Sequence, residues 1–368
     1  MFKIKYHIYF LFFFLFGSRF ILQAQDITTL KSETSGQNDT NKIATWLKIA
    51  NLFSDKYGRP DSLLYYSEIA LKKASELNYT EGQQNALLNI AIAYLKKNNL
   101  DSSMAILNKL LIATKKSKDL TLKGNIKYYL GFNYRIKNDA KSAAEYYFAS
   151  VTDYEKSKYY DGIGLAYLRL GGIFVFEKQF DQALLYGRKA IALLPKTVEP
   201  FTKVTILSGM SGICIQVATK DINFIDTSIV FAKTALVLAD QFGYYTKGNQ
   251  SCVSISNAYS IKGDNELALV YCKQAMNYRK YLFPSEIVIS YLNFSDCYAR
   301  LKQYKIALAY LDSSKIVLRS SPDPYYEMLI EERVYNYNKE TGNFAAALDG
   351  KERYDLIKDS LFTIEKNE

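Results

Sequence analysis

The stretch LGGIFVFEKQFDQALLYGRKAIALLP, residues 170–195, decides the fold of this 368-residue chain. It places small residues at Gly171 and Ala183 and an aromatic residue, Phe174, three positions after the first. Residues three apart lie on the same face of a helix. Small residues twelve apart allow two antiparallel helices to approach closely where they cross. The stretch therefore predicts a tightly packed helical hairpin that ends at Pro195.

The same spacing of small and aromatic residues recurs along the chain. The first key position of the eight units is Ala50, Ala91, Gly131, Gly171, Gly212, Ser256, Ser295 and Val334, which is small in all but the last. Successive units are 39 to 44 residues apart, and those that begin at Ala50 and Gly212 have a longer loop. Because no unit can bury its apolar face alone, neighbouring units must stack. The sequence predicts an all-α solenoid of about eight helical hairpins over residues 42–368.

Turn residues and prolines support this division. Polar clusters separate the two helices of five units, at residues 97–99, 137–139, 178–179, 262–265 and 341–343. The six prolines lie at predicted helix boundaries, where a missing N–H group does least harm: Pro60, Pro195, Pro200, Pro284, Pro322 and Pro324. No stretch shows the sustained two-residue alternation of a half-buried strand.

On these residues the chain resembles the tetratricopeptide repeat (TPR) family, with the match covering about residues 41–362. Its order of Gly or Ala, aromatic, Ala, aromatic, Ala and Pro is similar to the family's, most clearly in residues 170–195. The period is longer than the usual thirty-four residues. The family's leading Trp is absent from every unit, and Tyr167 takes its place in the fourth. The resemblance implies a right-handed superhelix whose inner face, made by the first helix of each unit, binds a peptide or protein segment.

The resemblance also implies which residues line that inner groove. With the first small residue as position eight, positions two, five, nine and twelve face inward. The candidate binding residues are Asn51, Asn125, Tyr128, Phe132, Arg135, Asn257, Asp296, Glu331 and Tyr335. Amides and aromatic rings in a groove can contact an extended backbone and its side chains. The alternative is that these side chains are solvated or pack locally. The family's paired basic clamp for a carboxylate is not found, and Arg135 is the nearest basic candidate.

The N-terminus predicts export. Residues 1–24 have the three parts of a signal peptide: basic Lys3 and Lys5, the apolar run 8–16, and Ala24 before a cleavage site. We expect a flexible, polar leader over residues 25–41. The mature protein is then periplasmic or secreted. The alternative is a signal anchor in the inner membrane. A lipoprotein anchor is not expected, because no cysteine lies near the cleavage site.

Composition argues against catalysis. The only histidine, His7, lies in the predicted signal peptide, so the mature chain has no Ser-His-Asp or Cys-His site and no His-ligated metal. We predict no catalytic residue, no cofactor and no metal. The mature chain has 44 basic and 37 acidic residues, spread without a basic run, which does not indicate nucleic-acid binding. Its four cysteines are expected to be small buried side chains, with Cys252 and Cys272 as the one pair that could form a disulfide.

The end of the chain carries a second resemblance. Residues 354–362, YDLIKDSLF, are similar to the junction in exported TPR sensor proteins of the Bacteroidota type, in which a membrane span and a histidine kinase or helix-turn-helix regulator follow. This implies a sensory or adaptor role with a membrane histidine kinase or a transcription regulator as partner. The alternative is a glycan-capture accessory protein of an outer-membrane importer. The sequence leaves open the ligand, the oligomeric state and whether the chain is a truncated sensor or a stand-alone protein.

Overall fold

The computed structural model describes residues 27–34 and 39–367, and places Asn38–Glu368 in one compact unit. The predicted signal peptide, residues 1–24, lies outside the described residues. Within the predicted leader, residues 27–33 form helix α2 (Ile27–Glu33), and the first helix of the compact unit begins at Asp39. No helix among the described residues has the length and apolar character needed to cross a membrane.

The compact unit is all-α, and its described residues contain no strand. Its elements are α3 (Asp39–Tyr57), α4 (Pro60–Glu76), α5 (Thr80–Lys96), α6 (Leu100–Ala113), α7 (Leu120–Ile136), α8 (Ala140–Ser157), α9 (Tyr160–Phe176), α10 (Phe180–Ala192), α11 (Pro200–Val217), α12 (Phe224–Phe242), α13 (Tyr245–Lys262), α14 (Asn265–Met276), the short 3₁₀ helix η1 (Arg279–Tyr281), α15 (Pro284–Arg300), α16 (Tyr304–Ser320), α17 (Pro324–Glu340) and α18 (Phe344–Asn367).

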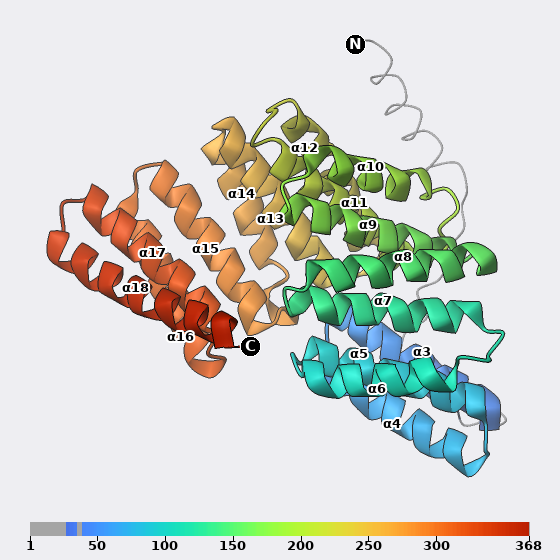
Figure 1. Ribbon diagram of the computed structural model, residues 1–368. Coiled ribbons are helices and arrows are strands. Elements are labelled where there is room, and N and C mark those ends of the chain that lie inside the picture. Colours follow the sequence, from blue (N-terminus) through green and yellow to red (C-terminus); the bar gives the residue numbers. More distant parts are fainter. Residues whose placement is uncertain (1–26, 35–38, 368) are drawn as a thin grey trace, which may run out of the picture. The chain divides into compact units, whose positions relative to one another are not determined.

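These helices form eight antiparallel hairpins among the described residues, which confirms the predicted helical-repeat solenoid. Each odd-numbered helix packs against the even-numbered helix that follows it and against the next odd-numbered helix. The odd-numbered helices therefore form one continuous layer and the even-numbered helices a second layer (Figure 1). Four prolines begin helices, at Pro60, Pro200, Pro284 and Pro324, as their positions predicted.

Close helix contacts occur at most of the predicted small residues, and Gly171 shows why. A Cβ atom there would lie 3.2 Å from the backbone oxygen of Ala183 and 2.9 Å from a methyl carbon of Ile213. The fifth unit differs from the sequence interpretation. Gly212 has nothing within 4 Å of its Cβ position, whereas the neighbouring Ser211 is fully buried and hydrogen-bonds Ser228 at 2.9 Å. The small residue that α12 contacts is therefore Ser211.

Most turns between the two helices of a unit contain one residue in the left-handed region of backbone conformation. These residues are Gly58, Asn98, Asn138, Lys178, Gly263, Lys302 and Gly342, with φ between 58° and 84°. The predicted turns at residues 97–99, 137–139, 178–179, 262–265 and 341–343 are confirmed. Exposed ion pairs repeat beside three of these turns, where a lysine reaches the first turn of the helix thirty-six residues earlier: Lys97–Asp61, Lys137–Asp101 and Lys262–Asp226. Each contributes at most about 1 kcal/mol.

Within the compact unit the odd-numbered layer curves until its first helix meets helices far along the chain. Helix α3 contacts α13. The ring centroids of Tyr57, at the end of α3, and Tyr245, at the start of α13, lie 6.3 Å apart. Tyr245 in turn stacks on Tyr281, with ring centroids 3.7 Å apart. The ring of Phe283 lies against Gly58. The layer from α3 to α13 thus closes one turn of the superhelix and brings the first unit against the sixth and seventh.

The four cysteines are buried and free, which confirms their interpretation as small core residues. The pair that the structure brings together is Cys272 on α14 and Cys297 on α15, whose sulfur atoms lie 3.6 Å apart. Cys252 instead packs on Ala232 and Leu236 of α12. The sequence missed this pairing because it lies between units, whereas Cys252 and Cys272 lie within one.

Candidate functional site

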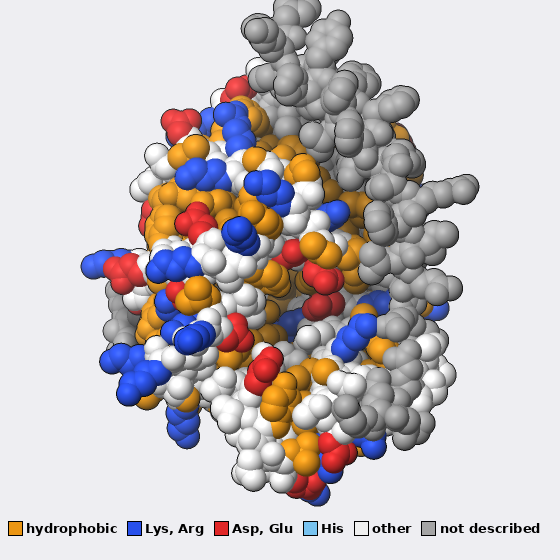
Figure 2. All heavy atoms as spheres, turned by 90° about the vertical axis from the view of Figure 1, so that its right-hand side faces the viewer, with side chains coloured by type: hydrophobic (Ala, Val, Ile, Leu, Met, Phe, Trp, Pro, Cys, Tyr) orange, Lys and Arg blue, Asp and Glu red, His pale blue; other side chains and the backbone are white. Residues whose placement is uncertain are grey.

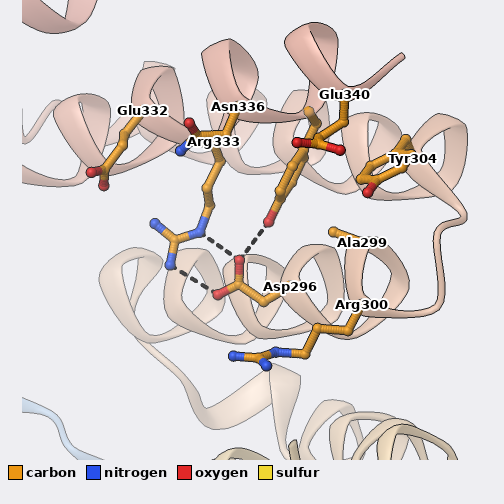
Figure 3. Close-up of a pocket in the computed structure, with 9 residues that line it drawn as sticks. Asp296, Ala299, Arg300, Tyr304, Glu332, Arg333, Asn336 and Glu340 are labelled. Carbon is orange, nitrogen blue, oxygen red and sulfur yellow. Dashed lines mark hydrogen bonds and ion pairs between the residues drawn. The ribbon is translucent and has the colours of Figure 1, made fainter.

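Two polar regions lie on the layer of odd-numbered helices. The first, here called the C-terminal pocket, lies between α15 and α17 and has a volume of about 690 Å³. Asp296, Arg300, Tyr304, Glu332 and Arg333 are among its lining residues (Figure 3). The second, here called the central cluster, comprises Asp55 on α3, Lys96 on α5, Arg169 on α9, Lys247 on α13 and Glu286 on α15.

The C-terminal pocket is built around an ion pair that the chain satisfies by itself. Arg333 donates two hydrogen bonds to Asp296, from Nε at 2.8 Å and from Nη2 at 2.9 Å (Figure 3). Asp296 also accepts a hydrogen bond of 2.6 Å from the hydroxyl of Tyr337. Arg333 gives a further bond from Nη1 to the backbone oxygen of Leu329. All three nitrogen atoms of the Arg333 guanidinium therefore donate hydrogen bonds within the protein.

The central cluster forms because the superhelical turn closes. Lys247 interacts electrostatically with Arg169 and Lys96, which repel it, and with Asp55 and Glu286, which attract it. These five side chains come from helices spread over seven units. They keep contact with solvent, and Lys96 is exposed, although the surrounding helices displace much of the water. Figure 2 shows a hollowed face of the molecule on which acidic and basic side chains gather.

Arg169 is held in place by aromatic residues of α7. Its Nε donates a 3.0 Å hydrogen bond to the hydroxyl of Tyr128, and the guanidinium lies over the ring of Phe132, 4.7 Å from its centroid. Tyr128 is itself only 6% exposed and packs against Tyr147. The side chain is thus fixed on one edge and one face, while Nη1 and Nη2 make no hydrogen bond with any described residue.

The pKa values of Lys247 and Lys96 are both lowered, and the nearby carboxylates oppose this shift. Burial, followed by repulsion from Arg169 and Lys96, lowers the pKa of Lys247 to about 8. Its Nζ lies 3.3 Å from Oε1 of Gln250 and 5.5 Å from the centroid of Phe201. The surrounding helices also displace water near Lys96, which lowers its pKa although the side chain is exposed, and Asp55 and Glu286 oppose the shift. Lys96 donates a short hydrogen bond to the hydroxyl of Ser54.

The carboxylates of the cluster are engaged elsewhere. Ser54 hydrogen-bonds Asp55 at 3.2 Å, and burial raises the pKa of Asp55 despite its attraction to Lys96. Glu286 accepts a 3.1 Å hydrogen bond from the backbone N–H of Phe283, which caps α15, and burial raises its pKa. Glu199, at the start of α11, also has its pKa raised by burial and by Asp161. No ion pair among the described residues joins Arg169 to a carboxylate.

The structure places the sequence-predicted groove residues in different settings. Tyr128 and Phe132 support Arg169, and Asn125 accepts a 2.8 Å hydrogen bond from Tyr154. Asp296 lines the C-terminal pocket. The others have exposed or locally paired side chains: Asn51, Arg135 and Asn257 are exposed, Glu331 is 3% exposed with Lys315 2.8 Å away, and Tyr335 lies under Lys339.

Sequence reasoning missed the central cluster. Asp55 and Lys96 stand at the same place in their units, five residues after the small residues Ala50 and Ala91. Lys247 and Glu286 likewise share a place, nine residues before the small residues Ser256 and Ser295. A search for charges that recur at one register would have found both pairs, but not that they face each other. No group of three potential metal ligands occurs among the described residues.

Comparisons with known proteins give structural similarity only. No family model and no curated protein matches the chain. A signal transduction ATPase of the STAND type with a tetratricopeptide repeat sensor, from Pyrococcus horikoshii, is similar with a TM-score of 0.61 and 15% identity over 98% of this chain; the match spans 54% of the ATPase chain. A Rap protein complexed with Competence and Sporulation Factor is similar with a TM-score of 0.57 and 13% identity, over 92% of this chain and 97% of that chain.

The Cut9–Hcn1 hetero-tetramer of the APC/C is a third similar structure, with a TM-score of 0.56 and 15% identity over 84% of this chain and 54% of the matched chain. At these identities the similarity concerns the fold. The chain shares with these structures an all-α helical-repeat fold, and one of them, the ATPase, has a tetratricopeptide repeat sensor.

Proposed function

We propose that this protein is a non-catalytic scaffold that binds a peptide or protein segment along the layer of odd-numbered helices, with the central cluster as the principal contact. The observation that supports this most directly is the central cluster itself. Charged groups of both signs and aromatic rings converge there in a setting that water reaches only in part, which is suited to binding a polar ligand. The similar Rap protein, of nearly the same length, was solved in complex with Competence and Sporulation Factor.

The proposal extends to place and partner. The signal-like residues 1–24 support export, so we place the scaffold in the periplasm or the medium, as the sensory or adaptor part of a signalling system. A membrane histidine kinase or a transcription regulator is the partner that the C-terminal resemblance implies. N-terminal sequencing of the protein recovered outside the cytoplasm tests the export step: a chain that begins at Gln25 supports it, and a chain that retains residues 1–24 contradicts cleavage.

Peptide binding is tested with a randomised hexapeptide pool. The full chain, produced with its own N-terminus, is mixed with the pool, separated by size exclusion, and the retained peptides are sequenced by mass spectrometry. We expect retention of a restricted set of sequences, and loss of that set in a Lys247→Glu variant that keeps its helical circular dichroism. A wild-type protein that retains no peptide would contradict the proposed function.

Glycan capture for an outer-membrane importer is the second candidate function. The many tyrosines, 32 in all, are compatible with stacking on sugars. Several of them pack against one another, as Tyr128 does on Tyr147 and Tyr134 on Tyr146. A glycan array with no signal above background excludes this alternative.

A further inference from the structure

Two buried thiols meet at the junction between the sixth and seventh units. Cys272 on α14 and Cys297 on α15 have sulfur atoms 3.6 Å apart, and the two residues are only 2% and 1% exposed. The buried residues that share an apolar cluster with them are Ala268, Leu269 and Phe294. The two sulfur atoms are therefore direct neighbours inside the packed contact between two units.

The distance between the two sulfur atoms suits a covalent bond. A disulfide bond is about 2 Å long, so the sulfur atoms need to approach each other by roughly 1.5 Å. Rotation of the two side chains about their Cα–Cβ bonds can supply an approach of this size. Cys214 and Cys252 lie in two other apolar clusters of the described residues. The geometry thus selects one pair out of the four cysteines.

Hydroxyl groups of α13 lie next to the pair. Oγ of Ser256 is 3.1 Å from Sγ of Cys272 and 3.6 Å from Sγ of Cys297, and Oγ of Ser260 is 3.8 Å from Sγ of Cys297. The hydrogen bonds from Cys272 and from the two serines lower the pKa of Cys297, although burial opposes this shift. Burial raises the pKa of Cys252 to about 12. Since the thiolate is the form that attacks a disulfide, Cys297 is favoured as the attacking sulfur.

We propose that Cys272 and Cys297 form a disulfide bond that joins the sixth unit to the seventh. The inference is independent of peptide binding. The oxidant is another disulfide, either of a small thiol such as glutathione or of a protein. Export, as proposed above, would bring the chain into a compartment in which such bonds persist.

The reaction is a thiol–disulfide exchange in two steps. The oxidant first reacts with Cys272 while the two units are still unpacked, because both sulfur atoms are buried in the folded chain. This step gives a mixed disulfide and releases one thiol. As the units pack, the Cys297 thiolate attacks Sγ of Cys272 and releases the second thiol. The chain thus gives up two electrons and two protons, and the two released thiols carry them away.

The bond would also hold the contacts that close the superhelical turn. The loop between the two cysteines contains Tyr281, which stacks on Tyr245, and Phe283, which lies against Gly58 of the first unit. The ends of this loop are 25 residues apart. Closing a loop of that length restricts the unfolded chain, so we expect the melting temperature to rise by about 5 °C on oxidation.

The test is oxidation with glutathione followed by peptide mapping. The reduced full chain is held in oxidised and reduced glutathione at the urea concentration that unfolds half of it, so that burial does not exclude the oxidant. Free thiols are then blocked with N-ethylmaleimide in concentrated urea. Trypsin, which cleaves after Lys and Arg, places the four cysteines on four separate peptides: residues 204–220, 248–262, 263–273 and 281–300. We expect peptides 263–273 and 281–300 to be crosslinked, and the other two to carry the blocking group.

Variants connect the bond to stability. Cys272→Ser and Cys297→Ser preserve the approximate size of the side chain, and in each of them oxidation should no longer raise the melting temperature. Cys252→Ser is the matched control, because it removes a buried cysteine of the same unit and should leave the crosslink intact. Circular dichroism shows whether each variant is folded, and the peptide map of the wild type depends on no variant. A wild-type chain with all four thiols blocked, or with Cys252 crosslinked to Cys272, overturns the inference.

Discussion

Arg169 in the central cluster and Arg333 in the C-terminal pocket are both partly buried on the layer of odd-numbered helices, and they differ in what surrounds them. Arg333 meets Asp296 one unit away and uses Nε, Nη1 and Nη2 within the protein. Arg169 meets a tyrosine hydroxyl and an aromatic ring, and its charge repels Lys247. Arg333 is thus paired within the chain, whereas we propose that a ligand pairs with the charges of the central units.

This comparison separates structural from functional charge. A partly buried ion pair whose hydrogen bonds are satisfied costs little to maintain and is expensive to break on one side only. A partly buried charge without such a partner weakens the fold and is retained where it serves binding. Substitutions in the C-terminal units should therefore affect stability, and those in the central cluster should affect binding with little loss of stability.

The largest effect is expected for Lys315→Met, in the C-terminal units. Lys315 pairs at 2.8 Å with Glu331, whose side chain is only 4% exposed. Removing the lysine leaves a buried carboxylate without its partner, so we expect a loss of about 3 kcal/mol in the free energy of unfolding. Urea denaturation followed by circular dichroism measures it. Glu331→Gln is the control and should lose less, because Lys315 is one-third exposed and can be solvated.

A pair of aspartate substitutions tests the contrast more directly. Asp296→Ala removes the acceptor of Arg333 and Tyr337 and should lower the free energy of unfolding by about 1–3 kcal/mol. Asp55→Ala removes a carboxylate whose pKa is raised by burial, so its charged form is already disfavoured, and we expect a change within about 0.5 kcal/mol. Equal losses in the two variants would mean that both clusters are structural.

The pH dependence of stability isolates Lys247. Its pKa is about 8 in the folded protein and about 10.4 when unfolded, so between these values the unfolded chain binds more protons. Stability contributed by this group is therefore present above pH of about 10.4 and lost as the pH falls through 8. We expect the difference in unfolding free energy between Lys247→Met and the wild type to favour the variant at pH 7 and to shrink as the pH rises to 10. A difference that does not vary with pH would show that neighbouring groups compensate.

The hairpins could be predicted from sequence because they depend on local spacing. Gly171 and Ala183 lie twelve residues apart, and that spacing alone fixes which faces of α9 and α10 meet. The fifth unit shows the limit. Ser211 and Gly212 are adjacent small residues before an unusually long loop, residues 218–223, so spacing could not decide which one α12 contacts.

The central cluster could not be predicted in this way. Arg169 and Lys247 lie on helices two units apart, and Asp55 reaches them only because α3 meets α13. That meeting depends on the small rotation between successive hairpins, summed over several units. Counting positions within one unit identified Tyr128 and Phe132, which contact Arg169. It did not identify Arg169 itself, because such counting does not include the rotation between units.

The smallest effect, and the one that best separates stability from binding, is expected at the turn after each arginine-bearing helix. The turn after α9 has Lys178 at φ 60°, and the turn after α17 has Gly342 at φ 77°. The left-handed region costs a lysine about 1 kcal/mol that glycine does not incur, and glycine loses part of this gain through its greater freedom when unfolded. Lys178→Gly should therefore raise the free energy of unfolding by up to about 1 kcal/mol, measured in urea.

The reciprocal substitution, Gly342→Lys, should lower the free energy of unfolding by a similar amount, about 1 kcal/mol. Neither turn contributes a side chain to the central cluster, so retention of the hexapeptide pool should be unchanged in both variants. If a gain of stability at Lys178 instead reduced retention, the central units would have to loosen in order to admit the peptide. Arg169 would then be exposed to its ligand through motion of the solenoid, and the contrast with Arg333 would lie in flexibility as well as in pairing.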